Sequence, residues 1–475
     1  SGNYNTAVGI NALYANTTAS NNTVMGVSAM FANTTGANNT AVGVETLRFN
    51  TTASNNTAVG YQAAYSNTTG ANITAVGYKA AFTSDSQGYI TAVGAYAGQS
   101  YAVTSGESYG STFVGVNSGN AVTTGKDNAF FGANSGYFNT TGGFNVAIGG
   151  GTLFSNTTAS NNTAVGYLAG CSNTTGTNNT ANGYQAFYSN TTGANNTANG
   201  VQALYSNTTG ASNTANGYGA LSFNTTASNN TAVGYLAGYS NTTGAENTVT
   251  GFAAMQYNTT AGSNSAFGSY ALRNNSTGQY NTSLGSNSLY SNTTASSNTA
   301  VGYLAGYSNT TGTEMAAVGL EALYNNTTGN TNTAMGRRSL YSNTTGFNNS
   351  AFSARALYTN TTGNYNVAVG MDSLYYNTTA SQNTAVGYQS SYKNTTGTDN
   401  LSSGIYSLYD NTTGSYNVAL GSSALENNTT ASNNTAVGYR AGYSITTSEL
   451  GVYIGSNAGE SVTTGSRNTM VGVNA

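Results

Sequence analysis

The chain has 475 residues, a net charge of −3 and only 5% charged residues, against about 25% in typical globular proteins. It has no His and one Cys, which leaves no ligand set for zinc, haem or iron–sulfur clusters and no Cys/His pair for catalysis, so we expect no cofactor, no metal and no enzymatic activity. Ten basic residues cannot follow a phosphate backbone, and no apolar run approaches the ~20 residues that span a bilayer. We therefore expect neither nucleic acid nor a membrane as a partner.

A repeat of 17 residues runs through the chain, with Asn56–Asn72 as a representative copy. We number its positions 1 to 17, so that the glycine of A-V-G stands at position 5. This position occurs 28 times from Gly9 to Gly472, and it is glycine in every copy except one, which has Ser353. Seventeen residues are too few for two helices and a turn, and they suit two short strands and two tight turns. The sequence therefore predicts an all-β protein, a parallel β-solenoid (β-roll) of 28 coils.

In chain order, the spacing is regular up to Gly94, and the next interval, to Gly115, has 21 residues instead of 17. Alignment of residues 102–106 with residues 121–125 divides the four additional residues into a pair near Ser100–Tyr101 and a pair near Glu107–Gly110. We therefore expect an irregular coil over 95–114, with two enlarged turns and an unbroken strand register.

Beyond Gly115 every interval has 17 residues. The prediction for residues 1–475 is one continuous solenoid segment. Both ends fall inside a repeat and neither has a capping sequence, which favours a segment of a longer chain or a rod whose ends dock on other subunits.

Asparagine occupies position 1 in 23 copies and position 12 in 22 copies. The N-T-T and N-N-T sequences match the acceptor pattern for N-glycosylation. However, aliphatic residues such as Ile73 and Val122 replace these asparagines, which favours buried side chains that form stacked ladders, each amide bonding its own turn and the amide one coil away. A glycan site stays the alternative. The representative ladder residues are Asn56, Asn162 and Asn179 at position 1, and Asn67, Asn173 and Asn190 at position 12.

Strand alternation then places positions 3 and 5 inside with position 1, and positions 2, 4 and 6 outside. Position 4 is aliphatic in most copies, so an apolar strip follows the outside of the solenoid and predicts an interface between chains. A bulge near position 2, which would turn position 4 into the core of a monomer, is the alternative. The predicted interface comprises Val8, Val42, Val59, Val165, Val233, Val301 and Val386, with Asn182, Asn199 and Asn216 as three successive polar interruptions.

The core sequence N-T-A-V-G-Y-x-A resembles the head repeats of trimeric autotransporter adhesins. It is more similar still to the N-T-A-V-G-Y-Q-A-L-Y-S-N-T-T-G arrays in fibre proteins of marine bacteria, phages and large algal viruses. The resemblance covers the whole chain, although the repeat is longer than is usual in the adhesin heads. It implies a parallel homotrimer of β-rolls, side by side, with an adhesive role.

Together these features predict a structural rod in an extracellular or virion fibre, such as an adhesin or tail-fibre shaft, at the cell or virion surface. A cell-surface or glycan receptor would be contacted through tip domains outside this sequence. A self-assembling extracellular filament is the alternative, and an ice- or glycan-binding solenoid is a minor one. Positions 11 and 13 would supply an ice-binding pair. The tyrosines of position 10 (Tyr65, Tyr205, Tyr341 and Tyr409) form either a packing seam or a glycan contact.

Overall fold

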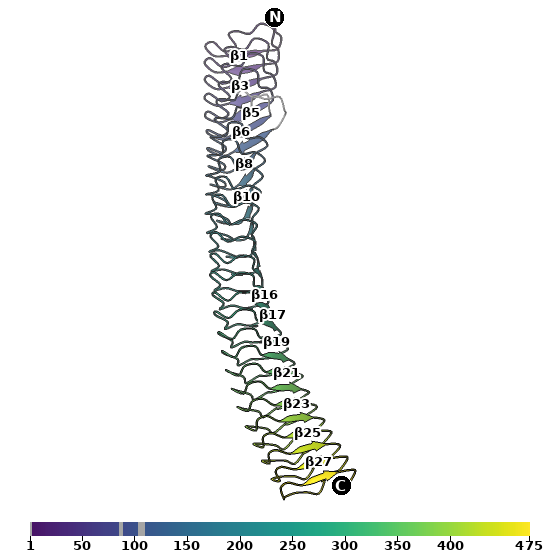
Figure 1. Ribbon diagram of the computed structural model, residues 1–475. Coiled ribbons are helices and arrows are strands. Elements are labelled where there is room, and N and C mark those ends of the chain that lie inside the picture. Colours follow the sequence, from purple (N-terminus) through teal and green to yellow (C-terminus); the bar gives the residue numbers. More distant parts are fainter. Residues whose placement is uncertain (1, 85–88, 103–109) are drawn as a thin grey trace. The chain divides into compact units, whose positions relative to one another are not determined.

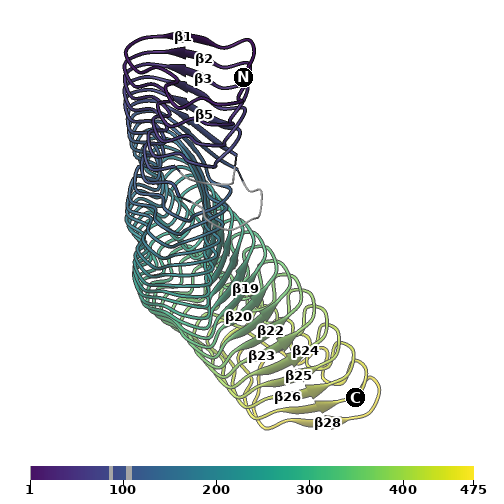
Figure 2. The same cartoon turned by 90° about the horizontal axis from the view of Figure 1, so that it is seen from above.

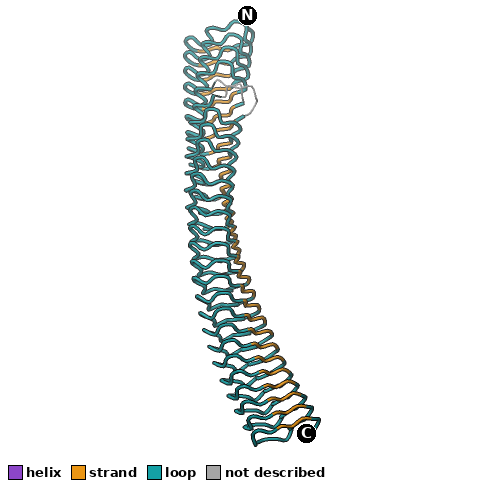
Figure 3. Tube along the Cα trace, viewed as in Figure 1, coloured by secondary structure: helices purple, strands orange, loops and turns teal. Residues whose placement is uncertain are grey.

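The computed structural model describes residues 2–84, 89–102 and 110–475, and these residues form 28 β-strands and no helix (Figures 1 and 3). The chain divides into two compact units, Ser1–Leu236 and Ala237–Ala475. In each unit the strands are parallel and follow one another in chain order, one strand for each repeat. The predicted parallel β-solenoid is therefore confirmed.

Fourteen strands belong to the first unit, and from β1 to β14 successive strands pair at the same repeat positions, as in Thr163 beside Thr180. They are β1 (Thr6–Val8), β2 (Thr23–Met25), β3 (Thr40–Val42), β4 (Thr57–Val59), β5 (Ile73–Val76), β6 (Ile90–Val93), β7 (Ser111–Val114), β8 (Ala129–Phe131), β9 (Val146–Ile148), β10 (Thr163–Val165), β11 (Thr180–Asn182), β12 (Thr197–Asn199), β13 (Thr214–Asn216) and β14 (Thr231–Val233).

Fourteen further strands form the second unit with the same register, and Figure 2 shows β19 to β28 side by side. They are β15 (Thr248–Thr250), β16 (Ser265–Phe267), β17 (Thr282–Leu284), β18 (Thr299–Val301), β19 (Ala316–Val318), β20 (Thr333–Met335), β21 (Ser350–Phe352), β22 (Val367–Val369), β23 (Thr384–Val386), β24 (Leu401–Ser403), β25 (Val418–Leu420), β26 (Thr435–Val437), β27 (Val452–Ile454) and β28 (Thr469–Val471).

Among the described residues each coil has one strand, at positions 2 to 4 or, in β5 to β7, at positions 1 to 4, so the expectation of two strands per coil is wrong there. The reason is backbone conformation: in the copy that starts at residue 56, Gln62, Ala64 and Asn72 have φ angles of 55°, 50° and 60°. Left-handed residues at positions 7, 9 and 17 interrupt extended structure. The backbone still bonds from coil to coil there, since the Ala64 N–H donates to the Ala80 carbonyl oxygen at 2.9 Å.

The glycine of position 5 follows from two constraints on the backbone. Gly200 has a φ of 134°, which L side chains rarely adopt, and a Cβ atom on it would lie 2.4 Å from the carbonyl oxygen of Gly217 in the next coil. Ser353 occupies the equivalent position with a φ of 112°. Its backbone is therefore strained where the other copies use glycine.

The irregular coil keeps the strand register, since Ile90 pairs with Ser111 and Val93 with Val114. However, the regular bonding between coils continues to Ala102, whose N–H donates to the Thr123 carbonyl oxygen at 2.9 Å. The expected enlargement near Ser100–Tyr101 is therefore wrong. The pair expected near Glu107–Gly110 lies outside the described residues, except for its last member.

Aromatic residues fill the interior next to this coil. Tyr101 takes position 12 and is fully buried, 5.7 Å from Phe113 between ring centroids, and Phe113 lies 5.5 Å from Phe130. Both phenylalanines stand at position 3, where alanine is usual. Position 9 is glycine in these copies, because a Cβ atom on Gly119 or Gly136 would lie 2.4 or 2.3 Å from the ring. Large and small residues thus exchange places while the interior stays filled.

Candidate functional surfaces

The asparagines of position 12 form a ladder of side-chain amides in the interior of each unit. The Asn190 Nδ2 atom donates to Asn173 Oδ1 at 2.7 Å, and Asn173 Nδ2 donates to Asn156 Oδ1 at 3.0 Å. Each amide also donates to the position-15 carbonyl of its own coil, as Asn173 does to Gly176 at 3.0 Å. The predicted bonding, to the own turn and to the amide one coil away, is confirmed here.

The asparagines of position 1 bond differently. Asn162 Oδ1 accepts the backbone N–H of Asn179 at 2.9 Å, and Asn162 Nδ2 donates to the Gly176 carbonyl at 3.0 Å. Amide-to-amide bonds occur only in some coils, such as Asn196 Nδ2 to Asn179 Oδ1 at 3.2 Å. This ladder therefore joins side chain to backbone. Both ladders meet at the same carbonyl, because the Gly176 oxygen accepts from position 1 and from position 12.

Asn67 and Asn56 show where the ladders are complete and where they are interrupted. Asn67 donates to Asn50 Oδ1 and to the Gly70 carbonyl, and it accepts the Gly70 N–H at 3.0 Å. Asn56 Oδ1 accepts the Ile73 N–H at 2.8 Å, but its Nδ2 atom has no partner among the described residues. Ile73 still donates its backbone N–H to Asn56, but it has no side-chain amide that would continue the ladder.

The glycosylation alternative does not fit the folded solenoid. Asn67, Asn173 and Asn190 are at most 1% exposed, and their amide nitrogens donate to oxygens inside the coil. A glycan on such a nitrogen would replace these bonds and would have no space. The described geometry therefore favours structural ladders over glycan acceptors at these asparagines.

Position 4 lies outside, as strand alternation predicts. None of its 28 side chains is buried, while position 3 is buried from β2 to β27. Val8 is 55% exposed, Val59 36%, Val233 37% and Val386 39%, and Val42, Val165 and Val301 are half-buried. The alternative of a bulge that turns position 4 inward is therefore wrong. Each unit presents a continuous outer column of position-4 side chains, one residue per coil.

Three amides interrupt this column in the first unit. Asn182 pairs in register with Asn199, and Asn199 with Asn216. Asn182 and Asn216 are exposed and Asn199 is half-buried. Their side chains have no hydrogen bond to any described residue. These three side-chain amides therefore have to form their hydrogen bonds with water or with another molecule.

Stacked tyrosines form a second outer column at position 10. In the second unit Tyr307, Tyr324 and Tyr341 follow at centroid distances of 5.2 Å, with ring planes 7° apart. Charged residues pair across coils beside this column: Arg338 contacts Glu321 at 2.5 Å, and Lys393 contacts Asp410 at 2.7 Å. These ion pairs are partly exposed, so each contributes little to stability.

The threonine pair considered for ice binding does not form a free flat array. The Thr34 and Thr191 hydroxyls at position 13 donate to threonine carbonyls of the next coil, at 3.1 and 3.0 Å. Position 11 is interrupted by exposed aromatic residues such as Phe49 and Tyr257. Position 14 presents exposed threonines, among them Thr35 and Thr52.

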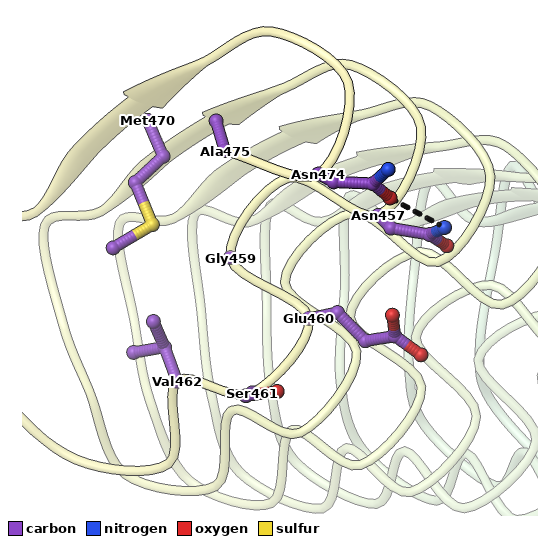
Figure 4. Close-up of a pocket in the computed structure, with 8 residues that line it drawn as sticks. All are labelled: Asn457, Gly459, Glu460, Ser461, Val462, Met470, Asn474 and Ala475. Carbon is purple, nitrogen blue, oxygen red and sulfur yellow. Dashed lines mark hydrogen bonds between the residues drawn. The ribbon is translucent and has the colours of Figure 1, made fainter.

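Pockets among the described residues include one at the last coil and one beside position 10 in the first unit. The first, of about 460 Å³, is the interior of the last coil, where Val462 and Met470 face a space that no further coil of this sequence covers (Figure 4). The second, of about 360 Å³, lies between Phe154, Leu168 and Cys171 in the first unit. Burial raises the pKa of the Cys171 thiol, which disfavours the reactive thiolate.

Within the described ranges, no three His, Cys, Asp or Glu side chains are placed to hold a metal ion, and no helix is long and apolar enough to cross a bilayer. Comparisons with protein-family models, curated proteins and solved structures find no match to this chain. Function therefore has to be inferred from the columns themselves.

Proposed function

We propose that this chain forms the shaft of an extracellular or virion fibre, in which three parallel copies lie side by side and bury their position-4 columns. The observation that supports this is the exposed column itself, which is apolar in most of the 28 coils. If each coil hides ~70 Å², the fourteen coils of one unit bury about 1,000 Å² per chain, which is the scale of a stable interface. Such association fits a fibre better than a solitary chain.

The interior supports a passive mechanical role. Wherever asparagines follow one another, ladders such as Asn173–Asn190 connect a coil to the next through side chains as well as backbone. The chain has few charges, no Pro and one Cys, which suits an exposed rod that is stable without disulfide bonds. In this proposal the fibre presents or spaces a binding tip, and receptor contacts belong to that tip rather than to the coils.

The number of chains per particle tests the assembly. Native mass spectrometry of the purified chain should give three copies, and Val42→Lys with Val59→Lys should shift the mass toward one copy, because lysines cannot be buried without partners. Thr35→Lys with Thr52→Lys places the same number of charges in two adjacent coils, one of them shared with Val42, on the exposed position-14 column and should leave the mass unchanged. A single-chain mass for the unaltered protein would refute the trimer. An open-ended distribution would support the self-assembling filament instead.

The three stacked amides have a place in this assembly. Around a three-fold axis, Asn182, Asn199 and Asn216 would form successive polar layers, which can fix register and chain number at some cost in stability. Changing all three to Val should raise the melting temperature and allow mixed registers, detected by cross-linking of labelled chains. A lower melting temperature with unchanged register would contradict this role.

The shaft function itself is tested by changing the number of coils. Deletion of residues 298–365 removes four complete repeats and joins position 17 to position 1. At a strand spacing of about 4.8 Å, the fibre should shorten by roughly 19 Å in electron micrographs, while attachment to its target is retained. Loss of attachment with normal assembly would place the binding activity in the coils and refute a spacer role.

A further inference from the structure

A run of eight tyrosines stands at position 10 in consecutive coils of the second unit. Their ring centroids are 5.0–5.3 Å apart and their planes differ by 7–29°. All eight side chains are half-buried. The tyrosine column comprises Tyr290, Tyr307, Tyr324, Tyr341, Tyr358, Tyr375, Tyr392 and Tyr409.

This stacking decides which parts of the rings can react or bind. Each inner ring has both faces covered by its neighbours, so a sugar ring cannot lie flat on it. The exposed parts are ring edges and hydroxyl groups. The column is therefore poorly suited to glycan binding by stacking, but the edges carry the ortho carbons at which phenols couple.

The surroundings concentrate oxidation on these phenols. Tyr376 lies at 73° to Tyr375, with 4.8 Å between centroids, and at 79° to Tyr392, with 5.2 Å. Tyr406 lies 5.6 Å from Tyr409. The chain has no Trp and no His, and its single Cys belongs to the first unit. Phenols are thus the principal groups of the second unit open to one-electron oxidation.

We propose that the tyrosine column is a site of oxidative cross-linking, at which hydrogen peroxide and a peroxidase couple phenols of neighbouring coils into dityrosine. Each of two phenols loses one electron and one proton, and the two radicals form one carbon–carbon bond between ortho carbons. Both rings then regain aromaticity by shifting the ortho hydrogen to oxygen. Two hydrogen atoms are removed in total, and one hydrogen peroxide is reduced to two water molecules.

The protonation state of the column agrees with this step. Burial raises the pKa of Tyr307, Tyr341 and Tyr375, and burial with a hydrogen bond to Tyr376 raises the pKa of Tyr392 to about 12. These four phenols are therefore protonated at neutral pH. Oxidation has to release the proton with the electron, and the exposed ring edges give water access to accept it.

Coupling would join residues 17 apart in sequence and would connect each coil covalently to the next. In a solenoid each coil contacts only its neighbours, so the structure can unfold locally, starting at any coil of low stability. A covalent bond between adjacent coils closes a short loop and limits this opening. Such links form within one chain, whatever the number of chains in the fibre.

The test treats the full chain, at low concentration, with hydrogen peroxide and a haem peroxidase, and maps dityrosine by peptide mass spectrometry. We expect linked peptides that join residues 17 apart, such as Tyr324 with Tyr341. The variant Tyr324→Phe, Tyr341→Phe, Tyr358→Phe should lose these links and part of the dityrosine fluorescence. It should fold normally, because Phe31 and Phe82 occupy position 10 in the first unit.

The matched control is Tyr303→Phe with Tyr439→Phe, which removes tyrosines that are 51% and 54% exposed and stack on no described ring. This control should keep the column links. Mixing isotope-labelled and unlabelled chains distinguishes links within a chain from links between chains. Cross-links confined to exposed tyrosines of different molecules, or equal dityrosine yields in the triple variant and the unaltered protein, would overturn the proposal.

Discussion

Replacement of Asn190 by aspartate tests the asparagine ladder with the smallest possible change. The side chain is fully buried, and its amide nitrogen donates to Asn173 Oδ1 at 2.7 Å and to the Gly193 carbonyl at 3.0 Å. Its oxygen accepts from Asn207 Nδ2 at 3.0 Å. An ionised carboxylate at this position still accepts the hydrogen bond from Asn207. Its other oxygen, however, faces Asn173 Oδ1 and the Gly193 carbonyl oxygen, which are acceptors too.

The loss of stability expected for Asn190→Asp follows from these contacts and depends on pH. Below about pH 4 the acid is neutral and its single O–H can restore one of the two donor bonds, so the loss is about 1–3 kcal/mol for the acceptor left unpaired. At pH 7 a charge is buried without a cation, and the loss grows to about 3–5 kcal/mol.

The sign of the pH dependence is fixed by linkage. The site raises the pKa of the carboxyl above its unfolded value of about 3.9, so the folded state binds more protons between the two values. Stability of the variant therefore falls as pH rises above about 4 and levels off above the folded pKa.

Urea unfolding of the Asn190→Asp variant should be followed at pH 3, 5 and 7, with hydrogen exchange of the surrounding coils as a local readout. Asn190→Leu is the matched control, because it removes the same donors without adding a charge and should show no pH dependence. Ile445 shows that an aliphatic side chain can occupy this repeat position. Equal unfolding midpoints of Asn190→Asp and unaltered protein at all three pH values would refute a buried ladder.

Three further expectations concern the backbone, the interior and the tyrosine column. Ser353→Gly should stabilise by about 1 kcal/mol by relieving strain, whereas Gly200→Ser should lower the melting temperature; the reverse order would contradict the steric argument. Phe130→Ala should lower the free energy of unfolding in urea by about 3–5 kcal/mol. Adding Gly136→Leu to the Phe130→Ala variant should restore part of this loss, whereas Gly136→Leu alone should not stabilise the protein. The pKa of Tyr392 is about 12 in the folded protein and about 10 in the unfolded chain, so the folded state binds more protons between these values. The contribution of Tyr392 to stability should therefore be fully present below pH 10 and decrease as the pH rises toward 12. Thermal unfolding alongside phenolate absorbance measures this. Ionisation of every phenol near pH 10 would contradict it.

Periodicity was sufficient to predict the solenoid, its parallel register and its inside and outside positions. A position that tolerates Asn, Ile and Val, but not charged residues, is an interior position wherever it lies in the chain, which is why Asn67 and Asn190 could be assigned to the interior. Alternation from position 1 likewise placed Val59 outside. These inferences need only the regular repeat, because each coil has the same neighbours.

The number of strands per coil and the hydrogen bonding of the two ladders could be determined only from the backbone conformation. Positive φ angles at residues such as Gln62 and Ala64 remove a second strand, and neither residue type indicates that conformation by itself. The position-1 ladder differs from the position-12 ladder because Asn162 reaches the N–H of the next coil rather than its amide. Composition alone makes the two ladders look equivalent.

The irregular coil shows most clearly what sequence alone left undecided. Alignment matched Ala102 with Ala121, whereas the structure places Tyr101 inside and bonds the Ala102 N–H to the Thr123 carbonyl oxygen. The interior there contains Phe113, and a tyrosine ring fills the space beside it. Local similarity determined the alignment, but side-chain volume contributed by another coil determines which residue is buried, and that volume is known only once the coils are stacked.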